Sequence, residues 1–541
     1  MIVSRRFFRR AAPAATVALS AVLAGSVVTA AGVTAAERVS GQSTAATSSA
    51  ALDLVVPVKT QTVQRYKGED IGLYGLGFYA VAPKDLEIRT HRGKSYKDPI
   101  TTTLSSGGVV TTLPAGITAS PSTLTKFFDV RVKGPAGKSV LSQKMDFCPS
   151  SAEQNRVTAE AVAESPYPQE CGSHPYALGH VFGLPAGWAT PVLGNWDNPL
   201  FFGGKDGTYT LTATVSKPWR KALGLTTAEG TSTIKIKVST VKEGSGFGTA
   251  STHDMNHNHG LSMTGIDMTA TDLSPQHAAR EAGRKAALGQ PNVPAKSAPT
   301  GNRLSAAAAD DLPKPDLRSL PAYQIRLDRT SKKNKTYLTF GATVWNAGPS
   351  PLVVDGFRKK GKSVLDAYQY FFDQDGKQVG YSPAGEMEWD PRTGHNHWHF
   401  KAFASYRLLD STKKKAVVSG KEAFCLAPTD SVDLTVDGAQ WQPESTDLYT
   451  ACGQGNANLL SIREVLSTGW GDTYSQDLPG QSFNITKVKA GVYYIQTLAN
   501  PDKKLAESTY ANNSALRKIK IGGKPGGKRT IKVYPYQGVK G

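Results

Sequence analysis

The fold class follows from residues 207–215, which read GTYTLTATV. Threonines alternate with tyrosine, leucine, alanine and valine, and this period of two places the apolar side chains on one face of a strand. Residues 231–238, which read TSTIKIKV, show a second strand-like run. Short runs of this kind extend back to residue 52, separated by Gly and Pro. Residues 52–240 therefore predict an N-terminal β-sandwich of the immunoglobulin-like kind.

Strand patterning returns in the second half, for example at residues 323–328, 337–346, 395–409, 483–488 and 492–498. We expect a second β-sandwich over residues 313–523, and so an all-β protein of two sandwiches. Residues 241–312 are rich in Gly, Ser, Thr and Ala and hold clustered His and Met, so they predict a flexible linker. Residues 524–541 contain Lys and Arg but no acid. They predict a basic tail outside the folded core.

Residues 1–36 predict an export signal. A basic start is followed by a run rich in Ala, Val and Leu and then by small residues near position 36. The pair Arg5-Arg6 after Ser4 also resembles a twin-arginine signal, and a retained single-span anchor is the alternative. Removal of the signal gives a secreted protein, extracellular or associated with the cell wall, with no membrane span. Its first residues, 37–51, are expected to be disordered.

Composition limits the function classes. The 541 residues include 63 Lys and Arg against 44 Asp and Glu, a net charge of +19, and 39% hydrophobic residues. So much apolar surface excludes wholesale disorder, and the charge of a secreted chain favours an anionic cell-wall polymer over nucleic acid as partner. The four cysteines suit two disulfides in an oxidising compartment. Cys148 with Cys171 is the simplest pairing in the first sandwich.

The strongest local motif is His395-Asn396-His397-Trp398-His399. Alternate side chains of a strand share a face, so three imidazoles would stand in a row. Such a row offers three nitrogens to one transition metal and leaves a coordination position open. The motif alone does not select among copper, zinc, nickel and iron. The alternative is a surface histidine cluster without a ligand.

Two further residues after the histidines, Lys421 and Tyr474, are relevant to the chemistry. Lys421 precedes the apolar run AFCL at 423–426, and Tyr474 ends the sequence DTY. A single lysine is usually a solvated charge and a single tyrosine usually belongs to the core. With the three histidines, however, the set resembles the catalytic domain of the lysyl oxidases over about residues 315–520. The resemblance continues through ITKVKAGVY at 485–493, NP at 500–501 and ESTYANN at 507–513.

The resemblance implies a copper site at His395, His397 and His399. It also implies a lysine tyrosylquinone cofactor made from Lys421 and Tyr474, which would be the catalytic residues. Cys425 and Cys452 would pair in this domain. A calcium site is implied at Asp316, Leu317, Glu507, Asn512 and Asn513, with ordinary turn capping by these residues as the alternative. Asp472 is a candidate general base, and a turn-forming Asp is the competing interpretation.

These features predict a secreted copper-dependent amine oxidase. Its substrates would be O₂ and a primary amine, either peptidyl-lysine or a small amine, and its products an aldehyde, hydrogen peroxide and ammonia. The alternative is a non-catalytic secreted β-sandwich protein that binds cell-wall polymer or copper.

Overall fold

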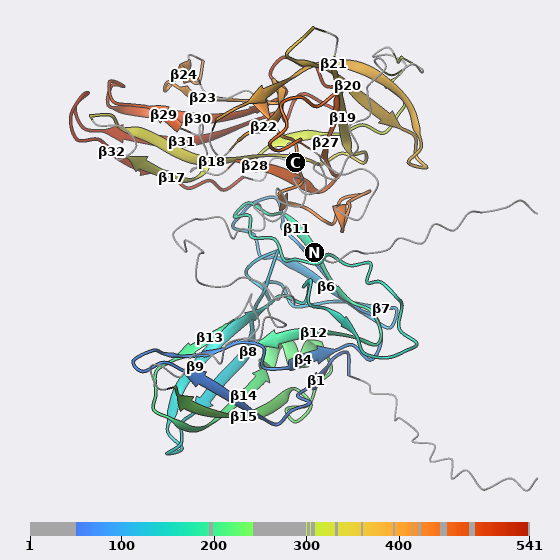
Figure 1. Ribbon diagram of the computed structural model, residues 1–541, viewed down its shortest axis with the longest axis vertical. Helices are drawn as coiled ribbons and strands as arrows, with labels where there is room; N and C mark the ends of the chain where they lie inside the picture. Colours follow the sequence, from blue (N-terminus) through green and yellow to red (C-terminus); the bar gives the residue numbers. More distant parts are fainter. Residues whose placement is uncertain are drawn as a thin grey trace, which may run out of the picture. The chain divides into compact units, whose positions relative to one another are not determined.

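The computed structural model describes residues 50–193, 199–241, 299, 303–304, 309–329, 334–358, 361–392, 395–414, 416–419, 423–443, 452–474 and 482–538. The expected export signal, most of residues 37–51 and most of the expected linker lie outside these ranges. Within them, we find no helix with the length and apolarity needed to span a bilayer. The strands of both halves belong to one compact unit, and Figure 1 colours them in sequence order.

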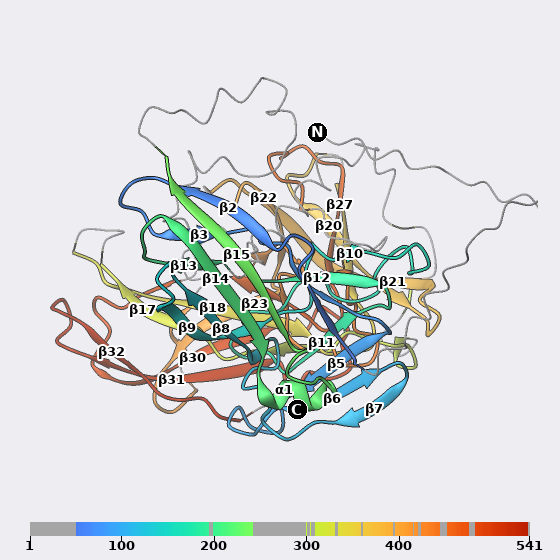
Figure 2. The same ribbon diagram turned by 90° about the horizontal axis from the view of Figure 1, so that it is seen from below.

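Sheets of short strands build the N-terminal half, residues 50–241. The largest orders β2 (Thr60–Arg65), β15 (Thr231–Thr240), β14 (Gly207–Val215), β8 (Leu124–Lys133) and β9 (Ser139–Phe147). Figure 2 shows β2, β15 and β14 side by side. A second sheet orders β1 (Asp53–Val55), β4 (Phe78–Val81), β12 (Trp188–Leu193) and β10 (Asn155–Arg156). A third orders β11 (Gly179–Leu184), β5 (Leu86–His91), β6 (Thr101–Ser106) and β7 (Val109–Thr112), and β13 (Leu200–Phe202) pairs with β3 (Ile71–Leu73).

Three sheets build the C-terminal half. The first orders β16 (Leu317–Ser319), β18 (Tyr337–Asn346), β28 (Trp470–Tyr474) and β26 (Asp430–Ser431), with β17 (Tyr323–Asp328) and β29 (Ser482–Asn484) also on β18. The second orders β25 (Ala423–Phe424), β22 (His397–Lys401), β21 (Gln378–Asp390), β20 (Leu365–Phe372), β19 (Leu352–Arg358) and β27 (Ser461–Leu466). The third orders β24 (Ala416–Ser419), β23 (Ala404–Leu409), β30 (Gly491–Ala499), β31 (Ser514–Gly522) and β32 (Thr530–Val533).

Buried and exposed side chains alternate along β14, as its sequence predicts. Tyr209, Leu211, Ala213 and Val215 are buried in the N-terminal core, whereas the threonines between them are at least partly exposed. The one helix of the described residues, α1 (Lys217–Ala222), follows directly and buries Trp219 against Phe127, with ring centroids 5.0 Å apart. The all-β prediction is confirmed. The described residues of the N-terminal half form four sheets, one of them with only two strands, and not the two sheets of a simple sandwich.

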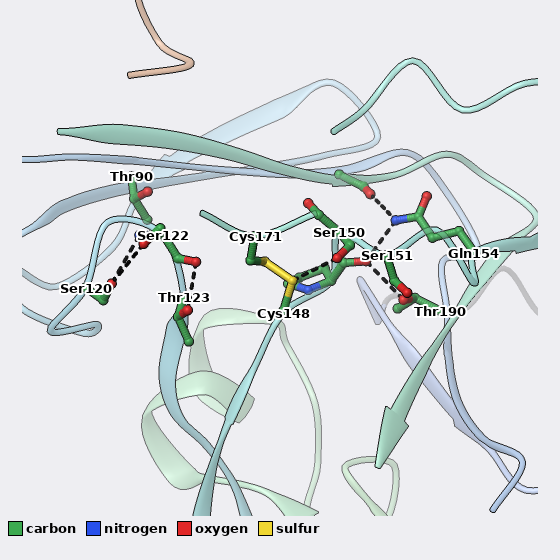
Figure 3. Close-up of a disulfide and its surroundings, with 12 residues drawn as sticks. Thr90, Ser120, Ser122, Thr123, Cys148, Ser150, Ser151, Gln154, Cys171 and Thr190 are labelled. Atoms are coloured by element: carbon green, nitrogen blue, oxygen red, sulfur yellow. Dashed lines mark hydrogen bonds between the residues drawn. A yellow bond between two sulfur atoms is a disulfide. The ribbon is translucent and has the colours of Figure 1, made fainter. Parts of the chain in front are cut away.

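Both disulfides expected from the sequence are present, Cys148–Cys171 and Cys425–Cys452. Figure 3 shows the first of them. Beside it, Gln154 donates through Nε2 to the carbonyls of Pro149 and Gly183 at 2.8 and 3.2 Å. These bonds fix the chain after Cys148 to β11. The bridge therefore anchors the residues that follow Cys171.

The residues after Cys171 contact the C-terminal half. The amides of Leu178 and Gly179 both donate to the carbonyl of Val432, at 2.6 and 3.3 Å. Tyr176 and Leu178 pack in one apolar cluster with Trp345, Val432 and other residues of the second half. Two sandwiches that simply share a linker would not bury these groups together.

Two boundaries differ from the sequence prediction. Ala50 and Ala51, expected to be disordered, are 1% and 4% exposed because they pack into the N-terminal core. The expected basic tail contains β32, which pairs antiparallel with β31. Within this segment Arg529 is fully buried and donates to the carbonyls of Gly523 and Val488. A buried guanidinium that satisfies backbone carbonyls belongs to the fold, not to a solvated tail.

Replacement of Arg529 by Ala should destabilise the protein by about 1–3 kcal/mol, because the buried carbonyl of Val488 and the carbonyl of Gly523 lose their donor. The neighbouring exposed Lys528 provides the matched control, and Lys528→Ala should change stability by less than about 0.5 kcal/mol. Chemical denaturation of both variants measures the difference. Equal stability of the two variants would contradict the structural role of Arg529.

Candidate metal centre and active site

The three histidines lie where β21 turns into β22. The strands pair antiparallel, with Asp390 opposite His397 and Glu388 opposite His399. Strand β22 begins only at His397, so the predicted row of three histidines on one continuous strand is wrong. Asn396 has φ +50°, a left-handed conformation that Asn tolerates, and the His395 amide donates to the Arg392 carbonyl at 2.9 Å. This turn brings His395 back over the strand.

Ring nitrogens of the three histidines converge. One ligand atom from each of His395, His397 and His399 lies within 4.8 Å of the others, and no other such group occurs among the described residues. His399 Nε2 is 2.8 Å from His397 Nε2 and 3.3 Å from His395 Nδ1. His395 and His399 are each 1% exposed, and His397 is partly exposed. Three nitrogens around a common point, with access from one side, suit a transition metal with an open coordination position.

Asp390 supports the cluster from behind. Its Oδ2 is 3.3 Å from His399 Nδ1 and 3.5 Å from His395 Nδ1. Arg392 clamps the same carboxylate, with Nε 2.8 Å from Oδ1 and a second nitrogen 2.5 Å from Oδ2. Burial opposes ionisation of Asp390, but the hydrogen bonds from Arg392 outweigh it and lower the pKa of Asp390 to about 2. The ionised Asp390 carboxylate can therefore orient the His399 ring through Nδ1, which leaves Nε2 of that ring for a metal.

Gln454 holds the histidines from the other side. Its Oε1 lies 2.8 Å from His397 Nδ1, and its Nε2 donates to the His395 carbonyl at 2.9 Å. The Cys425–Cys452 bridge fixes the loop that carries Gln454, and the Cys452 carbonyl accepts the Trp398 amide at 2.9 Å. The disulfide thus joins this loop, β22 and the end of β25.

Tyr474 packs on Phe424 of β25, the strand that pairs with the histidine strand β22. Its hydroxyl accepts the amide of Cys425 at 2.9 Å, and its ring meets Phe424 edge-on at 4.6 Å. Phe424 in turn pairs with Phe400, the residue after His399. The hydrogen bond with Asp390 raises the pKa of Arg392, and the phenol of Tyr474 acts in the same direction. Tyr474 is therefore close to the residue that clamps Asp390. Lys421 lies outside the described residues.

Comparison with known proteins agrees with this geometry. The family model for lysyl oxidase matches residues 372–527. This region is similar to the lysyl oxidase family. The chain is 32% identical to protein-lysine 6-oxidase of Gallus gallus over 127 residues, 23% of this chain and 26% of that protein. It is 31% identical to protein-lysine 6-oxidase of Sus scrofa over 137 residues, 25% of this chain and 48% of that protein.

The match to lysyl oxidase homolog 2 of Xenopus tropicalis is 27% identity over 139 residues, 24% of this chain and 16% of that protein. The chain thus spans less than half the length of each of these relatives. The matched lysyl oxidase region contains the three histidines, Lys421 and Tyr474. It does not include Asp316 or the N-terminal half.

The residues of the expected calcium site are also brought together. Glu507 accepts the Leu317 amide at 2.9 Å and the Nδ2 groups of Asn500 and Asn513 at 2.6 and 2.9 Å. Asn512 donates to both oxygens of Asp316, at 2.9 and 3.2 Å. The Oδ1 atoms of Asn512 and Asn513 are buried without a hydrogen-bond partner among the described residues. Burial raises the pKa of Glu507 to about 7.

Sequence patterns did not reveal Glu464 of β27. It is fully buried and accepts the Leu426 amide through Oε2 at 3.0 Å, with a second backbone bond from Phe400. Burial raises the pKa of Glu464 well above its usual range, and the charge of Asp472 adds to the shift. Glu464 therefore joins Phe400 of the histidine strand to Leu426, near the Tyr474 contact with Cys425, and its burial favours the protonated form. In the sequence, Glu464 stands in the run IREVL at 462–466. A charged residue in such a run is normally interpreted as an exposed strand position, so nothing marked it as buried.

Replacement of Asp390 by Asn should lower the affinity for Cu²⁺ about 10–100-fold, because the carboxylate no longer orients the His399 ring. Competition with a chelator of known affinity measures this loss without any turnover. Glu386→Gln on the same strand is the control, because its exposed side chain pairs with Lys401 at 3.3 Å. Unchanged Cu²⁺ affinity in Asp390→Asn would exclude a supporting role for this carboxylate.

Proposed function

We propose that this protein is a copper-dependent amine oxidase with a lysine tyrosylquinone cofactor formed from Lys421 and Tyr474. The observation that carries the proposal is the convergence of three histidine nitrogens beside a buried tyrosine, in a region similar to the lysyl oxidase family. The overall reaction converts R–CH₂–NH₂, O₂ and water to R–CHO, NH₃ and H₂O₂. Copper and the quinone, when present, supply the oxidation of the amine and the transfer of its electrons to O₂.

The residues of the chain hold these groups in place. His395, His397 and His399 would bind copper, with Asp390 and Gln454 fixing the ring orientations. The Cys425 amide positions the Tyr474 oxygen. Tight burial of Tyr474, which is 2% exposed, keeps bulk water from its ring.

Asp472 is the base that we propose for removal of a proton from the substrate carbon. It lies on β28 two residues before Tyr474, so both side chains point to the same face of the strand. Asp472 is 3% exposed. Burial raises the pKa of the nearby Glu464, and the charge of Asp472 raises it further, which favours the protonated form of Glu464 beside an ionised Asp472.

Acidic side chains near the histidines can attract a cationic substrate, although the net charge of the whole chain is +19. Glu386 and Glu388 lie on the same face of β21 as Asp390, and Glu388 is opposite His399. Their side chains are 42% and 46% exposed and share one cation, Lys401, at 3.3 and 3.9 Å, so the pair keeps a net negative charge. This acidic row favours a protonated amine at the approach to the histidines. The names of the relatives, protein-lysine 6-oxidases, suggest a peptidyl-lysine side chain as the substrate, with small amines as the alternative.

We propose further that the protein acts outside the cell, in line with the export signal that residues 1–36 predict and with the two disulfides. A calcium ion would bind Asp316, Glu507, Asn512 and Asn513, with the Leu317 amide held by Glu507. Two carboxylates and two amide oxygens without donors are the hard ligands that Ca²⁺ prefers.

Cofactor formation tests the proposal directly. After aerobic loading with copper, peptide mass spectrometry should find Lys421 covalently joined to Tyr474, and the protein should release H₂O₂ with primary amines. Tyr474→Phe should abolish both signals, whereas Tyr74→Phe, at a 42% exposed position in the other half, should change neither. Unmodified Lys421 and Tyr474 peptides after loading would instead favour the non-catalytic copper-binding or wall-binding protein.

Calcium should raise the thermal stability of the protein relative to a sample treated with chelator, since the ion binds only the folded form. A difference of a few degrees in Tm at millimolar Ca²⁺ is the expected result. Glu507→Gln should remove this difference. If Ca²⁺ does not change the Tm of the unaltered protein, these residues do not bind calcium and their role is turn capping.

A further inference from the structure

The sheet that carries Tyr474 has two covered faces. Thr343 of β18 pairs directly with Thr473 of β28, and Ala342 pairs with Tyr474. Because neighbours along a strand point to opposite faces, Thr343 and Thr473 lie on the face opposite Tyr474. Tyr474 and Ala342 lie in the core of the C-terminal half. Thr343 and Thr473 are nevertheless 1% and 0% exposed, so something covers their face as well.

The N-terminal half supplies this cover. His174 Nδ1 accepts the amide of Tyr176 at 3.1 Å, so its proton is on Nε2, which donates to Thr343 Oγ1 at 2.8 Å. Thr343 Oγ1 is 2.6 Å from Thr473 Oγ1. An unbroken series of hydrogen bonds therefore runs from the N-terminal half to the residue next to Tyr474.

Close backbone packing continues this contact. A side chain at Gly179 would place Cβ 2.4 Å from Asp433 Oδ1, and one at Gly172 would place Cβ 2.4 Å from Ser431 Oγ. The Leu434 amide donates to the Gly179 carbonyl at 3.0 Å. Only glycine permits such an approach at either position.

The partner surface in the C-terminal half is residues 427–443, here called the docking arm. It lies between Lys421 and Tyr474, in a stretch that is polar and rich in turns. Val432 and Leu434 of the arm are fully buried, in clusters shared with Tyr176, Leu178, Tyr167 and Val181 of the N-terminal half. Gln442 Nε2 also donates to the carbonyls of Ser165 and Tyr167, at 2.7 Å each.

We propose that the N-terminal half is a built-in partner of the oxidase domain, which docks on residues 427–443 and holds β28 in the position that Tyr474 needs. Its role is thus to complete the catalytic sheet from behind. The docking follows from the contacts alone, and the effect on Tyr474 rests on the proposed function.

Cleavage of the intact protein between the halves tests the docking. A specific protease site placed within residues 243–298 allows the folded chain to be cut. The two fragments should then remain together in gel filtration under native conditions. Gly179→Val should make them separate after cleavage, whereas Val109→Asp, at a 70% exposed site of β7, should not. Separation of the unaltered fragments, or equal retention in both variants, would overturn the proposal.

Acid provides a second measurement. Burial lowers the pKa of His174 to about 4, against the opposing charge of Asp430. The rings of Tyr176 and Tyr323 also face His174, and His91 lies 3.8 Å from Asp433 at the same contact. An undocked His174 binds a proton below about pH 6.5, so association should weaken as the pH falls from 6.5 to 4. The loss attributable to His174 is up to roughly 300-fold.

His174→Gln should flatten this pH dependence, while Val109→Asp should retain it. An identical pH dependence in His174→Gln and the unaltered protein would overturn the part assigned to His174. Copper-loaded cut fragments report the effect on Tyr474 separately: Gly179→Val should lose most of the Lys421–Tyr474 cross-link. Absence of the cross-link in the unaltered protein would refute the proposed function alone, because association does not depend on it.

Discussion

The pairing of β18 with β28 is the constraint on which the rest of the structure depends. It sets Tyr474 toward the core that contains Phe424 and Thr473 toward His174. A shift of one residue in this register would exchange the two faces. The phenol would then leave the histidines, and a threonine would stand in its place. The same strand register therefore determines both the position of Tyr474 on one face of the sheet and the contact with the N-terminal half on the other.

The metal centre shows how charge is managed in a protein with a net charge of +19. Three imidazoles stay available for a cation because one buried carboxylate, Asp390, is kept ionised by Arg392. Glu464, which is more deeply buried, has no cation among its described partners, and burial raises its pKa well above the usual range. Environment, and not residue type, separates the roles of these two acids.

Local patterns of the sequence were sufficient for both disulfides, the residues of the metal cluster and strands such as β14 and β15, but not for β32 or for the start of β22. Alternation predicted β14 because its core face is uniform along the strand. The turn at Asn396, the support from Gln454 and the burial of Arg529 were not predictable in this way. Each depends on a partner distant in sequence, and a polar residue at such a site looks like any exposed polar residue.

The contacts behind Tyr474 join segments far apart in the chain, with sequence separations of 130 for Thr343–Thr473 and 169 for His174–Thr343. Ordering so much intervening chain costs entropy before these contacts form, and chains dominated by such contacts fold slowly. Until β28 reaches β18, the edge of β18 remains open to other strands. Covering the sheet on both faces therefore has a kinetic cost, because the strand pairing behind Tyr474 must wait for distant segments of the chain to meet.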